Sequence, residues 1–600
     1  MRWVRRGDPN AELAARELAA ALQLPETLAR VLAARGIGSA DEAGRFFHPT
    51  FDQLHSPFEM TGMAVAVERL ERAIAQREPM LIYGDYDVDG TVATVILKTA
   101  VELLGGVCDF HVPHRLLEGY GMRDEVIERA AANGVRLIIS VDTGIRAFAA
   151  AQTAESAGLD LIVTDHHLVA PGEGVPKALA VLNPNQPECS YPCKSLCGAG
   201  VAFKLAQALL ERGGRGRLVP SFLKITALAT IADAVPLLGE NRVIVKLGLD
   251  GLHTVKNAGL RALMEVCELG EGFEREIGAT EVAFRIAPRI NAAGRMDVAR
   301  DVVELFTVKD EARARELARR LNELNAARQQ EEQRICAEVI EQVEKSEELR
   351  NSPCLVIEGA GWHRGVIGIC ASRVVDRFAR PAVVISRDGD EAYGSGRSIA
   401  GFHLLDALES AKELFSRYGG HAHAVGFALP SARVAELRRR LNEYAAERLT
   451  IEALQPVVEY DGELGMDEIT PRLWEQLHAM EPFGMGNPEP VFLARGALLM
   501  EEPRVLQEKH LKLKLRRYES GRSDGRARLA RGIDALGWRM APRLAEQPLA
   551  SGGRVDLLFR VEKNRHPDFG GGLQLVLSDF RLAEEDEQGE AVRSAANGIG

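Results

Sequence analysis

Several features that would assign the chain to a special class of protein are missing from its 600 residues. No run of about eighteen apolar residues occurs, so we expect no transmembrane helix. The first residues, MRWVRRGDPNAEL, are basic but lead into no apolar stretch of signal-peptide length. The sequence therefore predicts a cytoplasmic protein with no membrane partner.

Cysteine is scarce as well, with eight in the whole chain. Without a secretory signal, these indicate reduced thiols rather than a disulfide framework. One local cluster, Cys189, Cys193 and Cys197, has an every-fourth spacing that could supply three thiolates to zinc. No CxxC pair accompanies the cluster and no fourth ligand is evident nearby, so reduced thiols are the favoured interpretation and a structural zinc is the alternative.

An excess of positive charge is also missing, because the formal net charge is -12. This argues against a protein that coats duplex nucleic acid through a uniformly basic surface. A nucleic-acid enzyme with a basic channel on an acidic body remains compatible with the charge. With 46% hydrophobic and 27% charged residues, the chain has the composition of a globular protein.

The order of predicted elements indicates an α/β fold. Ala and Leu recur at helical spacing in the N-terminal segment, and short apolar runs at 80–84, 135–141 and 159–164 then alternate with helical stretches. Such alternation is typical of βαβ units with a parallel sheet. The domains we expect are a helical segment at 1–50, a parallel-sheet catalytic domain at 51–308, a connecting helix at 309–349, a second α/β domain at 350–452, and an OB-like β-barrel with a C-terminal tail at 453–600.

The connecting helix is predicted from a charged stretch that contains neither Gly nor Pro. Its apolar residues form a narrow stripe, which suggests a long helix exposed over much of its circumference. An ordinary amphipathic helix packed within one domain is the alternative. In the last section, HLKLKLRRY, VDLLFRVEK and LQLVLSDFRL alternate like strands, which favours a small β-barrel.

Acidic and imidazole side chains follow the apolar runs directly. Because the carboxyl ends of parallel strands meet at one edge of a sheet, we expect these segments to share a site. If the chain stays extended past its strand, the aspartates of DYDVDG point to one side and Gly90 frees the turn into the next helix. The residues are Asp85, Asp87 and Asp89 in DYDVDG, Asp142 in VDTG, Asp165, His166 and His167 in DHH, and Asp233 in ADAVPL.

Carboxylates packed this closely resist burial unless a positive charge neutralises them. Oxygen ligands with one or two imidazoles favour Mn²⁺ or Mg²⁺, and a pair of such ions suits phosphoester hydrolysis. A lone DxD is more often a turn or a helix cap, and a His-His pair alone says little. The joint occurrence of all four segments is the stronger signal.

The ordered set DYDVDG, VDTG, DHH and ADAVPL resembles the DHH phosphoesterase superfamily. The further segments VPHRLLEGYG, NPNQ, LCGAGVAFK, RIAPRINAAGRM, GWHRGVIGICASR, GSGRS and YGGHAHAVGF resemble its RecJ family of bacterial exonucleases, from about residue 50 to 585. The resemblance implies DHH and DHHA1-type domains in a metal-dependent enzyme of DNA repair and recombination that degrades single-stranded DNA from the 5′ end to mononucleotides. It also implies a monomer that works with a helicase and a single-strand-binding protein.

The resemblance further implies residue roles at the metals. One ion would be held by Asp85, Asp87 and Asp142, and the other by Asp89, Asp142, His166 and Asp233. Asp165 would orient the adjacent imidazole, and His167 would face the scissile phosphate. Related families place a histidine where this chain has Asp85, which leaves open which of the three DYDVDG aspartates binds directly.

Nucleic-acid contacts are implied at three further places. GSGRS, taken as a Gly-rich turn with Ser395, Arg397 and Ser398 as donors, would hold the 5′ phosphate with help from Arg115 and His363. His421 and His423 would line the same cleft, or they are histidines packed at a tight turn. Arg289, as part of the catalytic set, and Arg295 would contact the DNA backbone near the metals. Alternatively, they pair with the cluster of acidic residues that would hold the metals, called the acidic cage below.

Lys512, Lys514 and Arg516 form a basic strand in the last section, which suits the backbone of single-stranded nucleic acid. A charge run is more often only a solvated face. Two rival functions also stand beside the exonuclease. One is a phosphatase or short-oligonucleotide hydrolase of the same superfamily, and the other is an inactive relative that serves as a scaffold.

Overall fold

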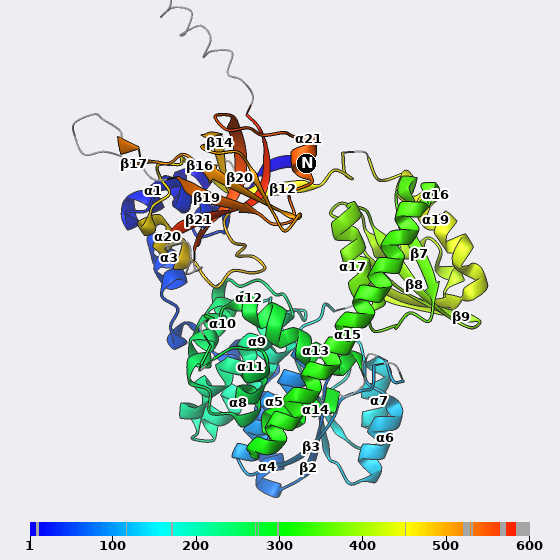
Figure 1. Cartoon of the computed structure of the whole chain (residues 1–600). Coiled ribbons are helices and arrows are strands. Elements are labelled where there is room, and N and C mark those ends of the chain that lie inside the picture. The colour runs from blue at the N-terminus through cyan, green and yellow to red at the C-terminus, as the bar shows by residue number, and fades with distance from the viewer. Residues whose placement is uncertain are drawn as a thin grey trace, which may run out of the picture. The chain divides into compact units, whose positions relative to one another are not determined.

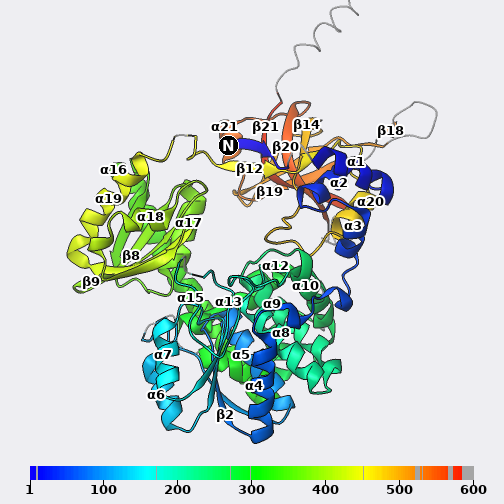
Figure 2. The same cartoon turned by 180° about the vertical axis from the view of Figure 1, so that it is seen from behind.

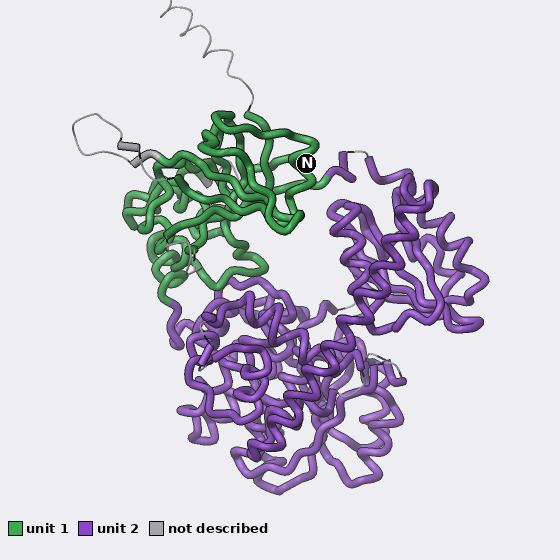
Figure 3. Tube along the Cα trace, in the orientation of Figure 1, with its two compact units in different colours: residues 1–48, 456–600 green, residues 49–455 purple. Residues whose placement is uncertain are grey.

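The structure is a computed structural model of the chain, and it describes all residues except 8–10, 116, 120, 170–171, 271, 274, 297–298, 451, 520–527, 530–531, 565–571 and 584–600. The chain forms two compact units, one of residues 49–455 and one of residues 1–48 with 456–600 (Figure 3). Each unit is described by itself. In the described part of the chain, no helix has both the length and the apolar character needed to span a bilayer.

The larger unit contains a five-stranded parallel sheet in the order β3-β2-β4-β5-β6, which confirms the predicted parallel-sheet domain. Side chains alternate along each strand, so Met80 and Ile82 pack beneath one layer of helices while Leu81 and Tyr83 face the other. Helices α4, α5 and α8 cover the first face and α6 and α7 cover the second (Figure 2). The bounds are β2 Pro79–Tyr83, β3 Val107–His111, β4 Leu137–Val141, β5 Asp160–Thr164, β6 Ala180–Leu182, α4 Met63–Gln76, α5 Val88–Leu103, α6 Asp124–Ala132, α7 Phe148–Ser156 and α8 Gly198–Arg212.

Helices complete this first lobe after the sheet. They run as α9 Leu223–Ala232, α10 Gly239–Gly251, α11 Ala258–Val266, α12 Ala279–Glu281, a π-helical turn Val282–Ile286, α13 Ala287–Arg295 and α14 Ala299–Thr307. A buried network ties α8 to α10, because Lys204 Nζ lies 3.0 Å from Glu240 Oε1 and the Tyr191 hydroxyl donates to Glu240 Oε2 at 2.6 Å. These contacts fix α8, whose first turn reaches the candidate site.

The connecting helix is present as α15 Glu311–Lys345, 35 residues long (Figure 1). Leu317 and Leu321 in its first half join the core of the first lobe. Ile335, Val339 and Val343 in its second half join a core of the next lobe. The prediction of a connector between domains is therefore confirmed, although one stripe of the helix is buried along its length.

The second lobe is the predicted second α/β domain, and its sheet has the order β10-β11-β9-β8-β7. The β7 and β8 strands are parallel and the other neighbours are antiparallel. The bounds are α16 Glu347–Asn351, β7 Leu355–Ala360, α17 Ile367–Phe378, β8 Ala382–Asp388, β9 Glu391–Arg397, α18 Leu404–Glu409, β10 Arg417–His421, β11 Ala424–Pro430 and α19 Val434–Ala446.

The smaller unit is built on a seven-stranded sheet in the order β13-β14-β20-β21-β19-β16-β15. The three stretches read as strands from the sequence correspond to β16 His510–Leu515, β20 Arg554–Lys563 and β21 Leu573–Leu582. β13 and β15 stand at the ends of this order, but the chain at the end of β14 also bonds to β16: Leu499 bridges Leu515, the Met500 amide donates to the Lys514 carbonyl at 2.8 Å, and the Arg516 amide donates to the Leu498 carbonyl at 2.9 Å. The strands from β14 to β16 therefore curl back on themselves, as the predicted OB-like barrel requires. The other bounds are β13 Gly462–Glu463, α20 Pro471–His478, β14 Phe492–Leu498, β15 Arg504–Leu506, β17 Tyr518–Glu519, β18 Arg528–Leu529, β19 Ile533–Gly537 and α21 Arg543–Glu546.

The N-terminal segment joins this smaller unit. Its strand β1 Arg2–Arg5 pairs in parallel with β12 Val457–Tyr460, and Trp3 Nε1 donates to Asp579 Oδ2 at 2.8 Å. The helices α1 Ala11–Leu22, α2 Glu26–Ala34 and α3 Ala40–Phe47 follow. Helical periodicity predicts these three helices, but such a pairing across more than 450 residues leaves no local pattern.

Candidate metal centre and phosphate site

The DYDVDG segment does not stay extended after β2, contrary to the expectation from its alternation. Asp87 caps α5, where its side chain accepts from the Gly90 amide at 3.0 Å, and Asp89 lies in the first turn of that helix. A Cβ on Gly90 would lie 2.6 Å from the Cβ of Asp85, so glycine is needed here for close approach rather than for a flexible turn. Asp85 and Asp87 remain in the loop at the strand end.

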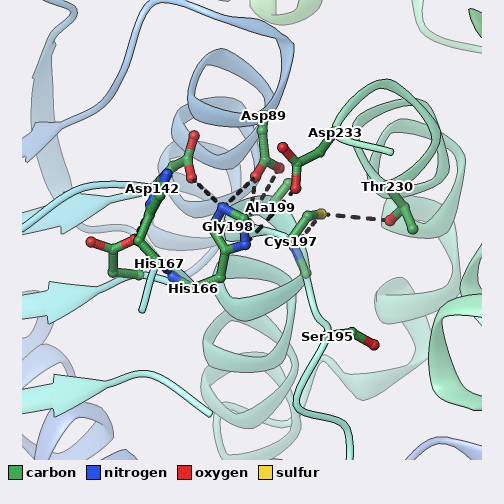
Figure 4. Close-up of polar contacts among 12 residues, drawn as sticks. Asp89, Asp142, His166, His167, Ser195, Cys197, Gly198, Ala199, Thr230 and Asp233 are labelled. Carbon is green, nitrogen blue, oxygen red and sulfur yellow. Dashed lines mark hydrogen bonds and ion pairs between the residues drawn. The ribbon is translucent and has the colours of Figure 1, made fainter. Parts of the chain in front are cut away.

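Asp89 is fixed by the beginning of α8. Its Oδ2 accepts from the Gly198 amide at 2.6 Å and its Oδ1 from the Ala199 amide at 2.8 Å (Figure 4). The unpaired amides at a helix N-terminus favour a negative charge in this position. The LCGAG segment therefore anchors a carboxylate at the site.

Asp142 follows β4 with φ of 59°, a left-handed conformation that only a few residues other than glycine adopt. Backbone strain of this kind persists only when the surroundings impose it, and it clusters at functional sites. The carboxylate is buried, and its Oδ1 lies 3.3 Å from Nε2 of His166. The strand end therefore directs Asp142 toward the DHH segment.

The DHH turn is organised by Asp165. Its Oδ2 accepts from the Ile145 amide at 2.9 Å, and its Oδ1 accepts from the amides of His166 and His167 at 2.7 and 3.1 Å. The same Oδ1 lies 2.7 Å from Nδ1 of His167. The imidazole that Asp165 orients is therefore that of His167 and not that of His166, because the tight turn folds the second ring back onto the carboxylate.

The four acidic segments converge as predicted, and His166 lies among them (Figure 4). Its Nε2 is 3.7 Å from Asp89 Oδ2, and its Nδ1 is 3.8 Å from Oδ2 of Asp233, the residue that ends α9. Ligand atoms that lie within 4.8 Å of one another form three groups in the described part of the chain. The groups are Asp85 with Asp87 and Asp142, Asp89 with His166 and Asp233, and Asp142 with His166 and His167.

The electrostatics of this cluster call for a cation. Burial, and then the neighbouring carboxylates, raise the pKa of Asp85 and Asp142 well above the ordinary value and raise that of Asp233 to about 9. Within the described residues, Asp85 Oδ1 and Asp142 Oδ1 are buried and have no hydrogen-bond partner. Buried carboxylate oxygens without a hydrogen-bond partner, together with one imidazole, are the ligands that Mn²⁺ and Mg²⁺ prefer. The residues of the cluster therefore fit such ions.

The two histidines differ in charge. Burial opposes a charge on His167, but its hydrogen bond to Asp165 prevails and raises its pKa to about 9. Burial lowers the pKa of His166, which leaves that ring neutral as a metal ligand must be. His167 is thus a cation at neutral pH beside a neutral ligand candidate.

The NPNQ segment after β6 supports the DHH turn from its other side. Asn183 Nδ2 donates to the His167 carbonyl at 2.9 Å, and Asn185 Nδ2 donates to the His166 carbonyl at 2.8 Å. Sequence reasoning gave no role to these asparagines, although their position one residue after a buried apolar run was a usable signal. Metal ligands held by such contacts keep their orientation.

A group of arginines lies next to the cage. Arg115 packs over the Tyr86 ring at 4.8 Å, and Arg295 Nη1 donates to the Gly365 carbonyl at 2.6 Å. Burial, together with the positive charges of Arg115, Arg328 and Arg397, lowers the pKa of Arg295 to about 10. Half-buried guanidinium groups that repel one another make a strong site for an anion.

The sequence predicts a turn at GSGRS, but this prediction is wrong. The segment is the end of β9 with one residue beyond it. A Cβ on Gly394 would meet the Phe427 ring at 2.0 Å, so the glycines allow close packing within the sheet. Arg397 Nη1 donates to Ser395 Oγ at 3.2 Å, and Ser398 Oγ donates to the Phe402 carbonyl at 2.7 Å. Ser395 and Arg397 therefore lie together at the strand end.

The remaining histidines flank this strand end. His421 and His423 are exposed at the turn between β10 and β11, which overturns the alternative that they are packed residues. His363 Nδ1 accepts from the Gly365 amide at 3.1 Å, in the loop that Arg295 contacts.

Arg289 points toward α15. Its Nε donates to Asn322 Oδ1 at 2.9 Å and its Nη1 to the Arg285 carbonyl at 2.7 Å. These contacts give no support to the alternative that it pairs with the acidic cage.

In the smaller unit, the basic strand β16 is partly neutralised. Lys512 Nζ lies 3.0 Å from Asp534 Oδ2 and Lys514 Nζ lies 2.8 Å from Asp534 Oδ1, while Arg516 follows the strand. Asp534 on the neighbouring β19 thus shares its charge between both lysines.

The cysteine cluster does not form a metal site with these ligands. Cys197 Sγ caps α8 by accepting from the Gly200 amide at 3.4 Å, and burial raises the pKa of its thiol. In the described residues, none of the groups able to hold a metal contains a cysteine.

Comparison with known proteins agrees with this geometry. Residues 79–230 match the DHH family, N-terminal domain, residues 351–447 match the DHHA1 domain, and residues 460–579 match the RecJ OB domain. The single-stranded-DNA-specific exonuclease RecJ of Bacillus subtilis is 39% identical over 97% of this chain and 71% of its own length. RecJ of Dickeya dadantii is 37% identical over 90% of this chain and 93% of its own length.

Solved structures agree as well. RecJ from Thermus thermophilus in complex with Mn²⁺ has a TM-score of 0.81 and 31% identity, covering 100% of this chain and 84% of that one. Its complex with Mg²⁺ has a TM-score of 0.75 and 30% identity, covering 97% of this chain and 79% of that one. Since its relatives align across nearly all of its length and its three matched domains stand in order, this chain belongs to the RecJ family of DHH proteins.

Proposed function

We propose that this protein is a metal-dependent exonuclease that hydrolyses single-stranded DNA from the 5′ end to mononucleotides, in DNA repair and recombination. The observation that carries the proposal is the convergence of Asp142 and Asp233 on His166, at 3.3 and 3.8 Å, beside a group of half-buried arginines. Acidic ligands for two cations next to a site for an anion are the arrangement that phosphodiester hydrolysis needs. The relatives reported above are named single-stranded-DNA-specific exonucleases.

Two groups of residues would hold the cations, Mn²⁺ or Mg²⁺. Asp85, Asp87 and Asp142 form one group, and Asp89, Asp142, His166 and Asp233 form the other, so that Asp142 is shared. When bound, such a pair makes a water nucleophilic at neutral pH and neutralises charge on the phosphate. The chain's own contribution is to hold the ligands in place, through the α8 amides on Asp89 and the asparagines behind the DHH turn.

His167 would act on the scissile phosphate. Against the effect of burial, the hydrogen bond to Asp165 raises the pKa of His167 and favours the protonated ring, which would act as a hydrogen-bond donor to the phosphate. Such a donor stabilises the negative charge that develops on the phosphate and the departing oxygen. Arg289, which we expected in the same catalytic set, would act from the α13–α15 contact through Asn322.

The 5′ polarity would come from the second lobe. Ser395 and Arg397 at the end of β9, with Arg115 and Arg295 from the first lobe, supply donors for a terminal phosphate. Ser398, His363, His421 and His423 lie on the segments around them. A strand whose terminal phosphate is held here would present its first internucleotide linkage to the metals.

Strand binding further along would use Lys512, Lys514 and Arg516 in the OB domain. The domain limits proposed are 1–50, 51–308, 309–349, 350–452 and 453–600. The proposal also includes a cytoplasmic monomer that acts with a helicase and a single-strand-binding protein. Light scattering of the purified protein and co-purification with such proteins test these last points.

The test of the main proposal compares single strands labelled at the 5′ or the 3′ end, a blunt duplex and a dinucleotide. We expect labelled mononucleotide to appear at once from the 5′-labelled strand, no reaction with the duplex, and loss of activity in chelator that Mn²⁺ restores. Early release from the 3′ label, or undiminished cleavage in chelator, would overturn the proposal. Equal or better turnover of the dinucleotide would instead favour a short-oligonucleotide hydrolase.

A further inference from the structure

The buried seam of α15 contains a polar segment between its two apolar halves. Its buried residues continue the same three- and four-residue spacing from Leu321 to Ile335 through Asn325, Arg328 and Glu332. Arg328 is 8% exposed and Glu332 is 6% exposed, so both charges are removed from water. The segment lies where the helix leaves the core of the first lobe and enters that of the second.

The contacts of this segment join α15 to α17. Arg328 Nη1 lies 2.6 Å from Glu332 Oε2, and Arg328 Nε donates to Asn325 Oδ1 at 3.2 Å. Glu332 Oε1 accepts from Nε of Arg373, a residue of α17, at 2.9 Å. A buried ion pair can often be replaced by apolar residues without loss of stability, so stability alone does not explain this one.

The position of this ion pair relative to the group of arginines at the anion site gives a better reason for its presence. Arg295 of α13 donates to the Gly365 carbonyl just before α17, and α13 packs against α15. The charges of Arg115, Arg328 and Arg397 all act on the Arg295 guanidinium. A Cβ on Gly368, in the first turn of α17, would lie 3.3 Å from Arg397 Nη2.

Arg373 and Gly368 both belong to α17. The helix that Glu332 holds through Arg373 therefore also places its first turn beside Arg397. Arg328 uses Nε and Nη1 within α15, and in the described part of the chain its Nη2 has no hydrogen-bond partner. That nitrogen remains free to donate to an anion. We propose that Arg328 is a further ligand of the terminal 5′ phosphate and that Glu332 is the positioning residue that sets its guanidinium.

This proposal rests on the proposed function, because it needs a strand bound by its 5′ end. The test measures KM and kcat of the full-length protein on single strands that carry either a 5′ phosphate or a 5′ hydroxyl. For Arg328→Gln we expect KM on the phosphorylated strand to rise roughly ten- to hundredfold, because one charge-assisted hydrogen bond is lost. The change on the hydroxyl strand should be much smaller. Arg319→Gln, an exposed arginine of the same helix, should match the wild type on both.

Arg328→Lys guards against a folding defect, because it keeps the charge but not the planar fork. It should lose part of the preference for the 5′ phosphate while unfolding at the wild-type temperature. An unchanged preference in both variants, or an equal loss on both strands, overturns the inference. A wild-type protein that does not degrade single strands from the 5′ end overturns the proposed function itself, which separates the two failures.

The role of Glu332 is tested by a double-variant cycle. If Glu332 acts through Arg328, Glu332→Gln reduces the preference for the 5′ phosphate alone but adds little in the Arg328→Gln background. If Glu332 only joins α15 to α17, Glu332→Gln lowers the unfolding temperature but leaves the preference for the 5′ phosphate intact. The decrease in unfolding temperature then adds in full to that caused by Arg328→Gln. The second pattern would remove the positioning role.

Discussion

The Gly198 backbone lies so close to Asp142 that a Cβ built on it would be 2.4 Å from Oδ1 of that carboxylate. The first turn of α8 therefore confines Asp142 on one side while its amides hold Asp89 on the other. The backbone of Asp142 is already in a left-handed conformation, with φ of 59° after β4. Two candidate ligands from separate segments, the first turn of α5 and the loop after β4, thus depend on one helix terminus.

We predict that Gly198→Ala weakens metal binding and lowers the rate on single-stranded DNA by about tenfold to a hundredfold, because Asp142 must shift from its place. The apparent dissociation constant for Mn²⁺ and the initial rate measure this. Gly44→Ala is the matched control, since a Cβ on this helical glycine meets nothing within 4 Å and alanine favours a helix. Wild-type metal affinity in Gly198→Ala would show that Asp142 is not a ligand.

The pH dependence of stability follows from the raised carboxyl pKa values. A folded-state pKa above the unfolded value means that the folded state holds the proton more tightly, so the stabilisation is present at low pH and is lost as pH rises. For Asp233 this window runs from its ordinary pKa of 3.8 to about 9, and Asp85 and Asp142 shift in the same direction. The metal-free protein should therefore lose stability across this range.

Divalent cations should reverse that loss, because they replace the protons. We expect the difference in unfolding temperature between Mg²⁺ and chelator to widen steadily from pH 5 to about pH 9. Groups outside the cage titrate in both samples and cancel in the difference. A gap that stays constant with pH would contradict the assignment of the cage as the metal site.

The main parts of the fold, and the convergence of the acidic segments, could be predicted because each has a local signal. Asp142 and Asp165 each follow an apolar run that is a parallel strand, and parallel strands bring such ends together, whereas Asp233 comes from the end of helix α9. The long helix was readable from a stripe that neither Gly nor Pro interrupts. The resemblance then supplied the roles that spacing alone does not give.

The corrections concern features that depend on partners distant in sequence. The sequence suggests that Gly394 belongs to a loop, but it lies in strand β9. Glycine is needed there because the Phe427 ring packs where a side chain would be. Asp87 reads as one of three alternating ligands, but the capping of α5 sets its direction. Nothing near Trp3 indicates its hydrogen bond with Asp579, because that contact exists only after both chain ends fold together.

The asparagines behind the DHH turn lead to a third prediction. Asn185→Asp keeps the size of the side chain but replaces the donor to the His166 carbonyl by a repelling oxygen. We expect kcat to fall roughly ten- to hundredfold with little change in KM, because the His166 ring loses its orientation while the strand still binds. Asn133→Asp, at the exposed end of α6, is the control that adds the same charge elsewhere. A loss confined to KM would assign Asn185 to strand binding instead.

A fourth prediction concerns Asp534, which shares its charge between Lys512 and Lys514. If these lysines bind the strand, Asp534→Asn removes the negative charge that Lys512 and Lys514 share and should tighten binding of single-stranded DNA in chelator, where no cleavage occurs. The slope of log affinity against log salt should then steepen by up to about 0.7 for each additional phosphate that the lysines neutralise. Fluorescence anisotropy with the full-length protein measures both quantities, with Lys514→Gln expected to change them in the opposite direction. A partly exposed ion pair contributes at most about 1 kcal/mol to stability, so the fold tolerates the change. If affinity and slope are unchanged in both variants, β16 is a solvated face and the strand crosses the OB domain elsewhere.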